Sequence, residues 1–289
     1  MSIVISGASG QLGRRAAERL LERVPPRDVV LVTRRPEELA YLADRGAEVR
    51  RGDFDGAEML RQAFAGGERL LLVSTSAVGR RVPQHRVAVD AAAAAGIGHV
   101  VYTSLSGPTA DNPAEVTWEH KTTEEILRDS GLTWTFLRNA IYAEHQVPGA
   151  AEAIAAGKLV DNRGDGRVAF VSRADCAAAA VAVLTSDGHE NVVYDVTGPE
   201  LLSSADAAAL LGELAGRPVE HHSVSDIELM ERLRAASLPE ERVRIATSLG
   251  TAVRTGHMDQ LSSAVQDLTG RRPQSLREVF EEHRGQLGL

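Results

Sequence analysis

Strand-length and helix-length segments alternate along the first half of the chain. Strand-length stretches occur at residues 3–5, 29–32, 47–51, 69–73 and 99–102, and each is followed by a longer segment of helical character. The continuous apolar run 29–32 is typical of a parallel strand that is covered on both faces. This alternation predicts an α/β fold with a doubly wound parallel sheet, in which ligands bind beyond the carboxyl ends of the strands.

The first of these strands runs directly into a glycine-rich turn and then into a helix. Glycines in such a turn permit a tight bend, close approach of the backbone to a pyrophosphate, and close packing of the helix, whose N-terminus attracts phosphate groups. The G-x-x-G-x-x-G spacing differs from the usual G-x-G-x-x-G, and the alternative is an ordinary turn between strand and helix. The context favours a Rossmann dinucleotide site, and the residues expected to bind the cofactor are Gly7, Ser9, Gly10, Gln11, Leu12 and Gly13.

Two arginines follow the second strand, about 20 residues beyond the glycine turn. A protein that selects NAD carries Asp or Glu at this place, where the carboxylate accepts a hydrogen bond from the ribose 2′-hydroxyl. Arg34 and Arg35 stand there instead, and a guanidinium can pair with a 2′-phosphate through two hydrogen bonds. The sequence therefore predicts NADP(H), with Arg34 the stronger candidate and Arg35 the second. The alternative is a pair of solvated loop arginines.

Asp53, Phe54 and Asp55 follow the third strand. Asp53 could accept from the adenine amino group, and Phe54 could pack on the adenine ring. We expect Asp55 to be the N-cap of a helix over residues 57–64, because a carboxylate can accept from the free N–H groups of a first turn.

Hydroxyl-bearing residues follow the fourth and fifth strands. They are Ser74, Thr75 and Ser76 after the fourth strand, and Thr103 and Ser104 after the fifth. In a doubly wound sheet these strand ends lie at the ligand crevice. We therefore expect these five residues beside the pyrophosphate and the nicotinamide ribose.

A helix is predicted over residues 117–127, with Trp118 on its apolar face, and a sixth strand follows. The residues after that strand, near the expected nicotinamide end, are Arg138, Asn139 and Tyr142. Asn139 could bond a substrate carbonyl, and Tyr142 could stack on a planar ring. Arg138 is a candidate for substrate binding, or it could hold the strand end through a carboxylate.

The chain has no clean domain boundary. Residues 1–138 are predicted to form the NADP-binding Rossmann core, to which later strands at 168–171 and 192–196 add. Residues 139–289 are predicted to form a smaller, mixed C-terminal part that binds substrate. We expect this part to pack across the strand ends and to form the other wall of the cleft.

Composition restricts the class of protein. The 289 residues include 43% hydrophobic and 25% charged residues, which is ordinary for a soluble protein, and no apolar run approaches the ~20 residues that cross a bilayer. A net charge of −8 argues against a nucleic-acid partner. Cys176 is the only cysteine and is expected to be a packed core residue. We expect no secretory signal, no membrane partner, no catalytic metal, and a cytoplasmic location.

Several segments together carry a resemblance to a known family. They are GASGQLG, Arg34 after the second strand, GDFD, HKTTEEILRDSGLTWTFLRNAIYAE, VSRADCAAAAVAVL, YDVTGPE and LTGRRPQSLREVF. With them the chain resembles the NmrA-like, atypical short-chain dehydrogenase/reductase group, especially its NADPH-dependent quinone oxidoreductase type. The resemblance covers essentially the whole chain. It implies a Rossmann fold and NADP(H), and a group that contains reductases of quinones and other carbonyls as well as non-catalytic NADP sensors.

The chain departs from the catalytic pattern that this resemblance implies. Short-chain dehydrogenases generally carry Tyr-x-x-x-Lys on the helix in question. Lys121 matches the lysine, but Thr117 stands at the tyrosine position, and a threonine is a poor proton donor because its pKa is far higher. Lys121 could bind the nicotinamide ribose or stabilise an oxyanion, and His120 could donate a proton. Adjacent helix residues point about 100° apart, so both cannot face the cofactor equally, and we favour Lys121.

Three functions remain open from the sequence. The first is an NADPH-dependent oxidoreductase that acts on a quinone or a similar small carbonyl or imine compound, since such a substrate needs little from the protein beyond position and charge. The second is a regulatory protein that senses NADP(H) without turnover, which the missing tyrosine favours. The third is a lyase, isomerase or epimerase that uses bound NADP transiently. We favour the first, with a small-molecule substrate. Apolar residues on the terminal helices could support a homodimer.

Overall fold

The computed structural model describes all 289 residues, and its centre is a sheet of seven parallel strands in the order β3-β2-β1-β4-β5-β6-β9. The strands are β1 (Ile3–Ser6), β2 (Val29–Thr33), β3 (Glu48–Arg51), β4 (Arg69–Leu72), β5 (His99–Leu105), β6 (Thr133–Asn139) and β9 (Val192–Val196). The strand order reverses between β1 and β4, which places a crevice at their carboxyl ends. The predicted doubly wound parallel sheet is confirmed.

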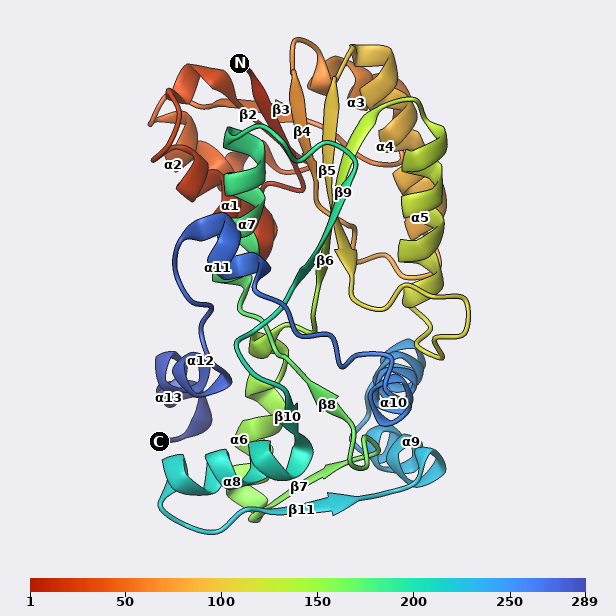
Figure 1. Ribbon diagram of the computed structural model, residues 1–289, viewed down its shortest axis with the longest axis vertical. Helices are drawn as coiled ribbons and strands as arrows, with labels where there is room; N and C mark the ends of the chain where they lie inside the picture. The colour runs from red at the N-terminus through yellow and green to blue at the C-terminus, as the bar shows by residue number, and fades with distance from the viewer.

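Helices cover both faces of this sheet (Figure 1). One face carries α1 (Gln11–Leu20), α7 (Arg173–Thr185) and α11 (Ala264–Thr269), and the other carries α3 (Ala57–Phe64), α4 (Arg81–Ala95) and α5 (Thr117–Asp129). None of the helices is long and apolar enough to span a membrane.

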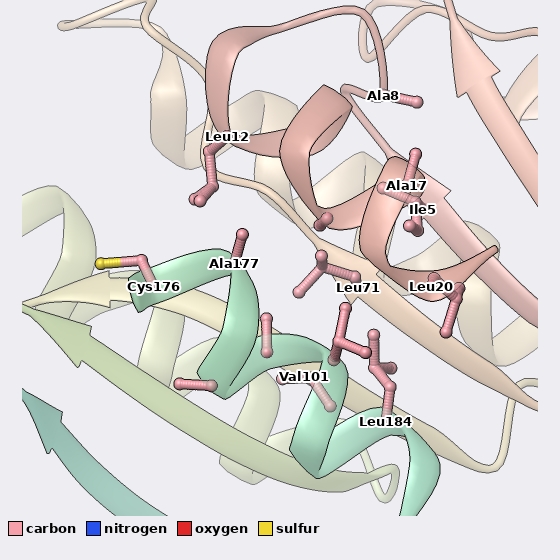
Figure 2. Close-up of a cluster of buried hydrophobic side chains, with 14 of the residues drawn as sticks. Ile5, Ala8, Leu12, Ala17, Leu20, Leu71, Val101, Cys176, Ala177 and Leu184 are labelled. Atoms are coloured by element: carbon pink, nitrogen blue, oxygen red, sulfur yellow. The ribbon is translucent and has the colours of Figure 1, made fainter. Parts of the chain in front are cut away.

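The apolar residues of β1, β4 and β5 pack against α1 and α7. Figure 2 shows Ile5, Leu71 and Val101 of the strands in one cluster with Leu20 of α1 and Leu184 of α7, and Cys176 lies at the far end of this cluster on α7. Cys176 is 1% exposed, which confirms its expected place in the core, and burial raises the pKa of its thiol well above the usual value. Burial of these continuous apolar strands is what holds the sheet between its two helix layers.

A smaller part lies beyond the carboxyl ends of the strands and has its own apolar core (Figure 1). Its strands form two pairs, an antiparallel pair of β8 (Arg167–Val168) with β10 (Leu202–Ser203) and a parallel pair of β7 (Lys158–Asp161) with β11 (Glu220–Ser223). Its helices are α6 (Val147–Ala156), α8 (Ser204–Ala215), α9 (Asp226–Ala235), α10 (Glu240–Arg254), α12 (Leu276–Glu282) and α13 (Arg284–Leu287).

The segment 168–171 does not add to the large sheet, contrary to the prediction. Only Arg167–Val168 forms a strand, and it pairs with β10 in the smaller part. The chain then passes close to Gly198, where a Cβ would lie 2.0 Å from the Phe170 carbonyl oxygen, and Val171 bridges to Tyr142. This buried apolar run is therefore a connection between two cores, which a short apolar pattern alone does not distinguish from a strand.

Three local predictions also need correction. Asp55 does not cap α3, because the N-cap is Gly56 and the Asp55 carboxylate instead pairs with Arg80 at 2.9 Å. The segment of helical character predicted after the second strand is a 3₁₀ turn, η2 (Pro36–Leu39), followed by one helical turn, α2 (Ala40–Ala43). Trp118 is 54% exposed, so it lies on the outer side of α5 and not on its packed face.

Candidate active site

A cavity of about 740 Å³ lies at the carboxyl ends of β1, β2, β3, β4, β5 and β6. This volume is within the range of roughly 300–1,000 Å³ that small-molecule and cofactor sites occupy. Ile245 and Leu249 of α10 line it from the C-terminal part. The expectation that this part forms the other wall of the cleft is therefore confirmed.

The glycine turn forms one end of the cavity. Gly7 has φ +63°, and a Cβ on Gly13 would lie 2.3 Å from the Gly7 carbonyl oxygen, so both positions require glycine. Helix α1 begins after Gly10 without a side-chain cap and without an acidic residue in its first turn. Its free N–H groups and positive dipole end can therefore accept an anion. Gly7, Ser9, Gly10, Gln11 and Leu12 line the cavity.

Arg34 and Arg35 both line the cavity after β2, but their surroundings differ. A guanidinium nitrogen of Arg35 lies 2.7 Å from the Glu38 carboxylate, while Arg34 has no carboxylate partner. Arg34 is thus the cation whose charge is left for a ligand at this edge.

Asp53 and Phe54 line the cavity after β3. The Asp53 carboxylate already accepts from the Asp55 N–H at 3.1 Å, which fixes the turn at this strand end. The Phe54 ring is tilted against the His85 ring, and the two ring centres lie 6.2 Å apart. Both predicted adenine-binding residues are therefore placed at the same edge of the cavity as Arg34.

The loop after β4 is held by helices α4 and α5. Ser74, Thr75 and Ser76 line the cavity. The Thr75 N–H donates to His85 Nε2 at 3.1 Å, and the Thr75 carbonyl oxygen accepts from Arg81 Nε at 2.8 Å.

Arg81 is itself anchored by a buried ion pair. One of its guanidinium nitrogens lies 3.0 Å from a carboxylate oxygen of Glu119 on α5, and Glu119 is 1% exposed. Glu119 also accepts from the Gly79 N–H at 3.0 Å. Removing either partner would leave an uncompensated buried charge, so this pair ties the loop firmly to α5.

Ser104 at the end of β5 lines the cavity, but its hydroxyl already donates a hydrogen bond within the protein. Ser104 Oγ donates to Glu124 at 2.7 Å, and Glu124 is held in turn by Arg138 at 2.7 Å and Arg128 at 3.0 Å. Ser104 therefore presents only lone pairs to a ligand and acts as a hydrogen-bond acceptor. The hydrogen bond between Arg138 and Glu124 also raises the pKa of the Arg138 guanidinium.

Asn139 and Tyr142 line the opposite side of the cavity. Asn139 Nδ2 donates to the Tyr142 hydroxyl oxygen at 3.1 Å, whereas Asn139 Oδ1 is buried without a hydrogen-bond partner. An unpaired buried acceptor costs about 1–3 kcal/mol, so this atom fits a donor on a bound ligand. The Arg173 guanidinium lies 4.8 Å above the Tyr142 ring, and the centre of the His145 ring lies 5.5 Å from the centre of that ring.

His120 and Lys121 face different ways on α5. His120 lines the cavity, and its Nδ1 lies 2.8 Å from the hydroxyl of the fully buried Tyr102. Lys121 does not line the cavity, because its ammonium pairs with Glu125 one turn further along the helix, at the surface. Burial lowers the pKa of His120 well below its usual range, with Arg81 and His85 adding to the effect, so the imidazole is neutral.

Comparison with known proteins agrees with this geometry. Residues 7–187 match a family described as NAD(P)H-binding. Quinone oxidoreductase 2 of Escherichia coli is 38% identical over 238 residues, which are 82% of this chain and 83% of that protein. An NmrA-like family oxidoreductase of Aspergillus flavus is 29% identical over 98% of this chain and 96% of its own length. The crystal structure of an E. coli NADPH-dependent quinone oxidoreductase with NADPH superposes with a TM-score of 0.94, at 34% identity, and covers 98% of this chain and 99% of that one.

The chain belongs to the NAD(P)H-binding, NmrA-like family. It is an enzyme of the NAD(P)H-dependent oxidoreductase class. Three features of its cavity fit an NAD(P)H molecule, namely the uncapped N-terminus of α1, the unpaired Arg34, and the unsatisfied Asn139 Oδ1.

The cavity of this NmrA-like enzyme contains most, but not all, of the residues predicted from the sequence. Four predicted residues do not line it. Gly13 packs against the Gly7 backbone, Thr103 accepts from the Ser74 N–H at 2.9 Å, and Arg138 is turned toward Glu124. Lys121 is the fourth, and its expected place beside the cofactor is corrected, because the 100° step along α5 brings His120 to the cavity in its stead.

Sequence reasoning missed several residues of this NmrA-like site. They are Arg81, Glu119, Tyr102 and Arg173. Arg81 and Glu119 are 38 positions apart in the sequence. In its own helix, each has the sequence context of an ordinary exposed charged residue. Only their shared burial marks them, and burial of a charge cannot be read from a local pattern.

Proposed function

We propose that the protein is an NADPH-dependent reductase that transfers hydride to a small electrophilic substrate, a quinone or another carbonyl or imine compound. The observation that carries the proposal is that one cavity joins an unpaired arginine, Arg34, to a substrate end of mixed apolar and polar character. A regulatory cofactor sensor would not need that second end. The E. coli relatives are quinone oxidoreductases, which supports the same substrate class.

In this proposal the glycine turn and the N-terminus of α1 hold the pyrophosphate, and Arg34 pairs with the 2′-phosphate, with Arg35 as a second cation nearby. A carboxylate at this place would repel that phosphate and select NAD. Asp53 and Phe54 contact the adenine. Bound NADPH would supply the hydride, while the chain supplies position and charge.

The residues on either side of the nicotinamide end would then orient the ligands. Ser104 and the loop of Ser74 to Ser76 accept from ribose hydroxyls, since Ser104 has only lone pairs to offer. Asn139 Oδ1 accepts from a carboxamide or substrate N–H, and Tyr142 packs on a planar ring. Val116, Ile245 and Leu249 exclude water around that ring.

The proposal is tested by following the loss of NADPH absorbance with a panel of quinones, aldehydes and cyclic imines, with NADH as the control cofactor. We expect turnover with quinones and a much lower kcat/KM with NADH. Tight NADPH binding with no turnover on any of these acceptors would overturn the proposal and favour the NADP(H) sensor instead.

A further inference from the structure

A set of buried hydrogen bonds between α4 and α5 fixes where each proton lies. The Thr75 backbone N–H can only donate, so His85 Nε2, at 3.1 Å, is an acceptor and carries no proton. The proton of the neutral imidazole is then on Nδ1, which donates to Thr123 Oγ1 at 2.9 Å. The Thr123 hydroxyl donates to the Glu119 carbonyl oxygen at 2.8 Å. Every donor in this set has an acceptor.

The hydrogen bond to Tyr102 determines the tautomer of His120. The Tyr102 hydroxyl is fully buried, and the acceptor within hydrogen-bond distance is His120 Nδ1 at 2.8 Å. Thr123 lies near this hydroxyl, but the hydrogen bonds of Thr123 Oγ1 run to His85 Nδ1 and to the Glu119 carbonyl oxygen, and none runs to Tyr102. If His120 Nδ1 carried the proton, the Tyr102 O–H would be left buried without an acceptor, at a cost of about 1–3 kcal/mol. The hydroxyl therefore donates to Nδ1.

The other ring nitrogen of His120 is left for the cavity. His120 Nε2 has no hydrogen-bond partner in the protein. It is not fully enclosed by protein atoms, and the His120 side chain lines the cavity. Because Nδ1 accepts from Tyr102, Nε2 carries the ring proton.

We propose that Tyr102 is a positioning residue that fixes His120 in the Nε2-protonated tautomer, so that His120 presents a neutral N–H donor to the acceptor atom of the substrate. This inference rests on the proposed reductase function for its chemistry, although the tautomer itself follows from the hydrogen bonds alone. It assigns to Tyr102 on β5 and His120 on α5 a role that the absent helix tyrosine does not fill.

A neutral N–H donor suits one class of acceptor. Hydride addition to a quinone moves an electron pair of the conjugated system onto a carbonyl oxygen, and the hydrogen bond from His120 Nε2 strengthens as that oxygen becomes negative. The imidazole does not give up its only proton, because burial opposes any ionised form of this side chain. The proton that completes the reduction to hydroquinone therefore comes from water. The substrate class is one with a carbonyl oxygen or imine nitrogen conjugated to the carbon or oxygen that receives the hydride.

The tautomer is tested without turnover by ¹⁵N NMR of the histidine rings in the full-length protein with NADPH. The spectrum of His120→Leu identifies the His120 signals, because they disappear. We expect Nε2 protonated and Nδ1 unprotonated at neutral pH, and a changed pattern in Tyr102→Phe, which keeps the buried ring and removes only the hydroxyl. A control change, Tyr194→Phe, removes a hydroxyl that lies 2.8 Å from His189 Nδ1 at the sheet edge and should leave His120 unaltered. Protonated Nδ1 in the wild type, or no change in Tyr102→Phe, would overturn the assignment.

The chemical role is tested by comparing two substitutions of His120. Glutamine keeps a neutral N–H donor in nearly the position of Nε2, whereas leucine keeps bulk and removes the donor. We expect kcat with a quinone to stay within about tenfold of wild type in His120→Gln and to fall about 100-fold or more in His120→Leu, the usual effect of losing an oxyanion donor. Tyr102→Phe should lose about two- to tenfold, and Tyr194→Phe nothing. Equal losses in the glutamine and leucine variants would show proton transfer from the imidazole, and no loss in either would show that His120 does not contact the substrate. If no quinone is reduced by the wild type, the proposed function fails while the NMR result still decides the tautomer.

Discussion

Arg34 and Arg35 are adjacent in the chain and line the same cavity, yet only Arg35 is neutralised, by a carboxylate oxygen of Glu38 at 2.7 Å. The Arg34 guanidinium has no such partner. The nearby Asp55 carboxylate is paired with Arg80 at 2.9 Å, so Arg34 stands beside the end of β2 as a cation without an ion pair of its own. A 2′-phosphate completes such an arrangement.

This difference predicts unequal effects of the two arginines on cofactor binding. In Arg34→Glu, attraction at the 2′-phosphate is replaced by repulsion, and a charge-assisted hydrogen bond of about 1.5–3 kcal/mol is lost, so the Kd for NADPH should rise at least tenfold. The Kd for NADH should change less than about threefold. Arg35→Glu is the matched control and should have the smaller effect. Fluorescence titration of both cofactors measures these values, and equal losses for NADPH and NADH would reject the role of Arg34.

Lys121 offers a test of its corrected position. Its ammonium is paired with Glu125 at the surface of α5 and does not reach the cavity. Lys121→Met should therefore leave kcat and the Kd for NADPH within about twofold of wild type, and it should cost at most about 1 kcal/mol of stability, as for other exposed ion pairs. A fall in kcat of tenfold or more would restore the catalytic role that the sequence suggested.

Gly13 is a position where the fold itself depends on a missing side chain. A Cβ there would lie 2.3 Å from the Gly7 carbonyl oxygen and 2.9 Å from the Ala8 Cα, both backbone atoms that cannot move aside alone. Gly13→Ala should lower the free energy of unfolding by about 1–3 kcal/mol or more and weaken NADPH binding by distorting the turn. Gly149→Ala in α6 is the control, since nothing lies within 4 Å of its Cβ, and it should stabilise by up to about 1 kcal/mol. Urea unfolding compares the two, and equal effects would contradict this account of the turn.

The lowered pKa of the buried His85 predicts that the folded protein loses stability on acidification. Burial, aided by Arg81 on the same helix, lowers its pKa to about 3, and the side chains facing it from β5 and α5 are Tyr102 and His120. Between about pH 6.5 and 3 the unfolded chain binds a proton at this residue and the folded chain does not. Acid therefore favours the unfolded state, by up to about 1.4 kcal/mol for each pH unit in that window.

The measurement is the free energy of unfolding by urea at several pH values from about 7 down to 4.5. His85→Gln should be less stable at neutral pH, because it loses a buried hydrogen-bond partner, but its stability should fall less steeply with acid. His120 retains its own share of the slope in both proteins. An unchanged slope in His85→Gln would show that His85 is not held neutral by the fold.

The sequence predicted the large sheet and the cofactor end of the site for physical reasons that are local. The glycine turn before α1 and the arginines after β2 act through backbone space and charge at strand ends, and parallel strands bring their carboxyl ends to one edge. Residues at those ends, such as Ser9 and Ser74, were therefore placed correctly in the cavity without knowledge of the packing.

The substrate end could not be predicted equally well, because its residues are selected by packing between distant segments. Whether His120 or Lys121 faces the cavity depends on the rotation of α5, which the buried contacts of Glu119, Thr123 and Glu124 set. The exposed Trp118 shows the same limit, since its apolar character pointed to the wrong face of that helix. Likewise, the apolar run at 168–171 leaves β8 after Val168 and is buried as a connection, and not as a strand of the large sheet.

The cavity is proposed to support hydride transfer from NADPH to an electrophilic small molecule. The most direct measurement is a single turnover in which the protein with one equivalent of bound NADPH is mixed with excess quinone, using NADPH deuterated at the transferred position in a parallel run. We predict that NADPH is oxidised in a one-to-one ratio with hydroquinone formed, and that deuteration slows the reaction. Bound NADPH that stays reduced in the presence of every quinone, carbonyl and imine acceptor would contradict the account.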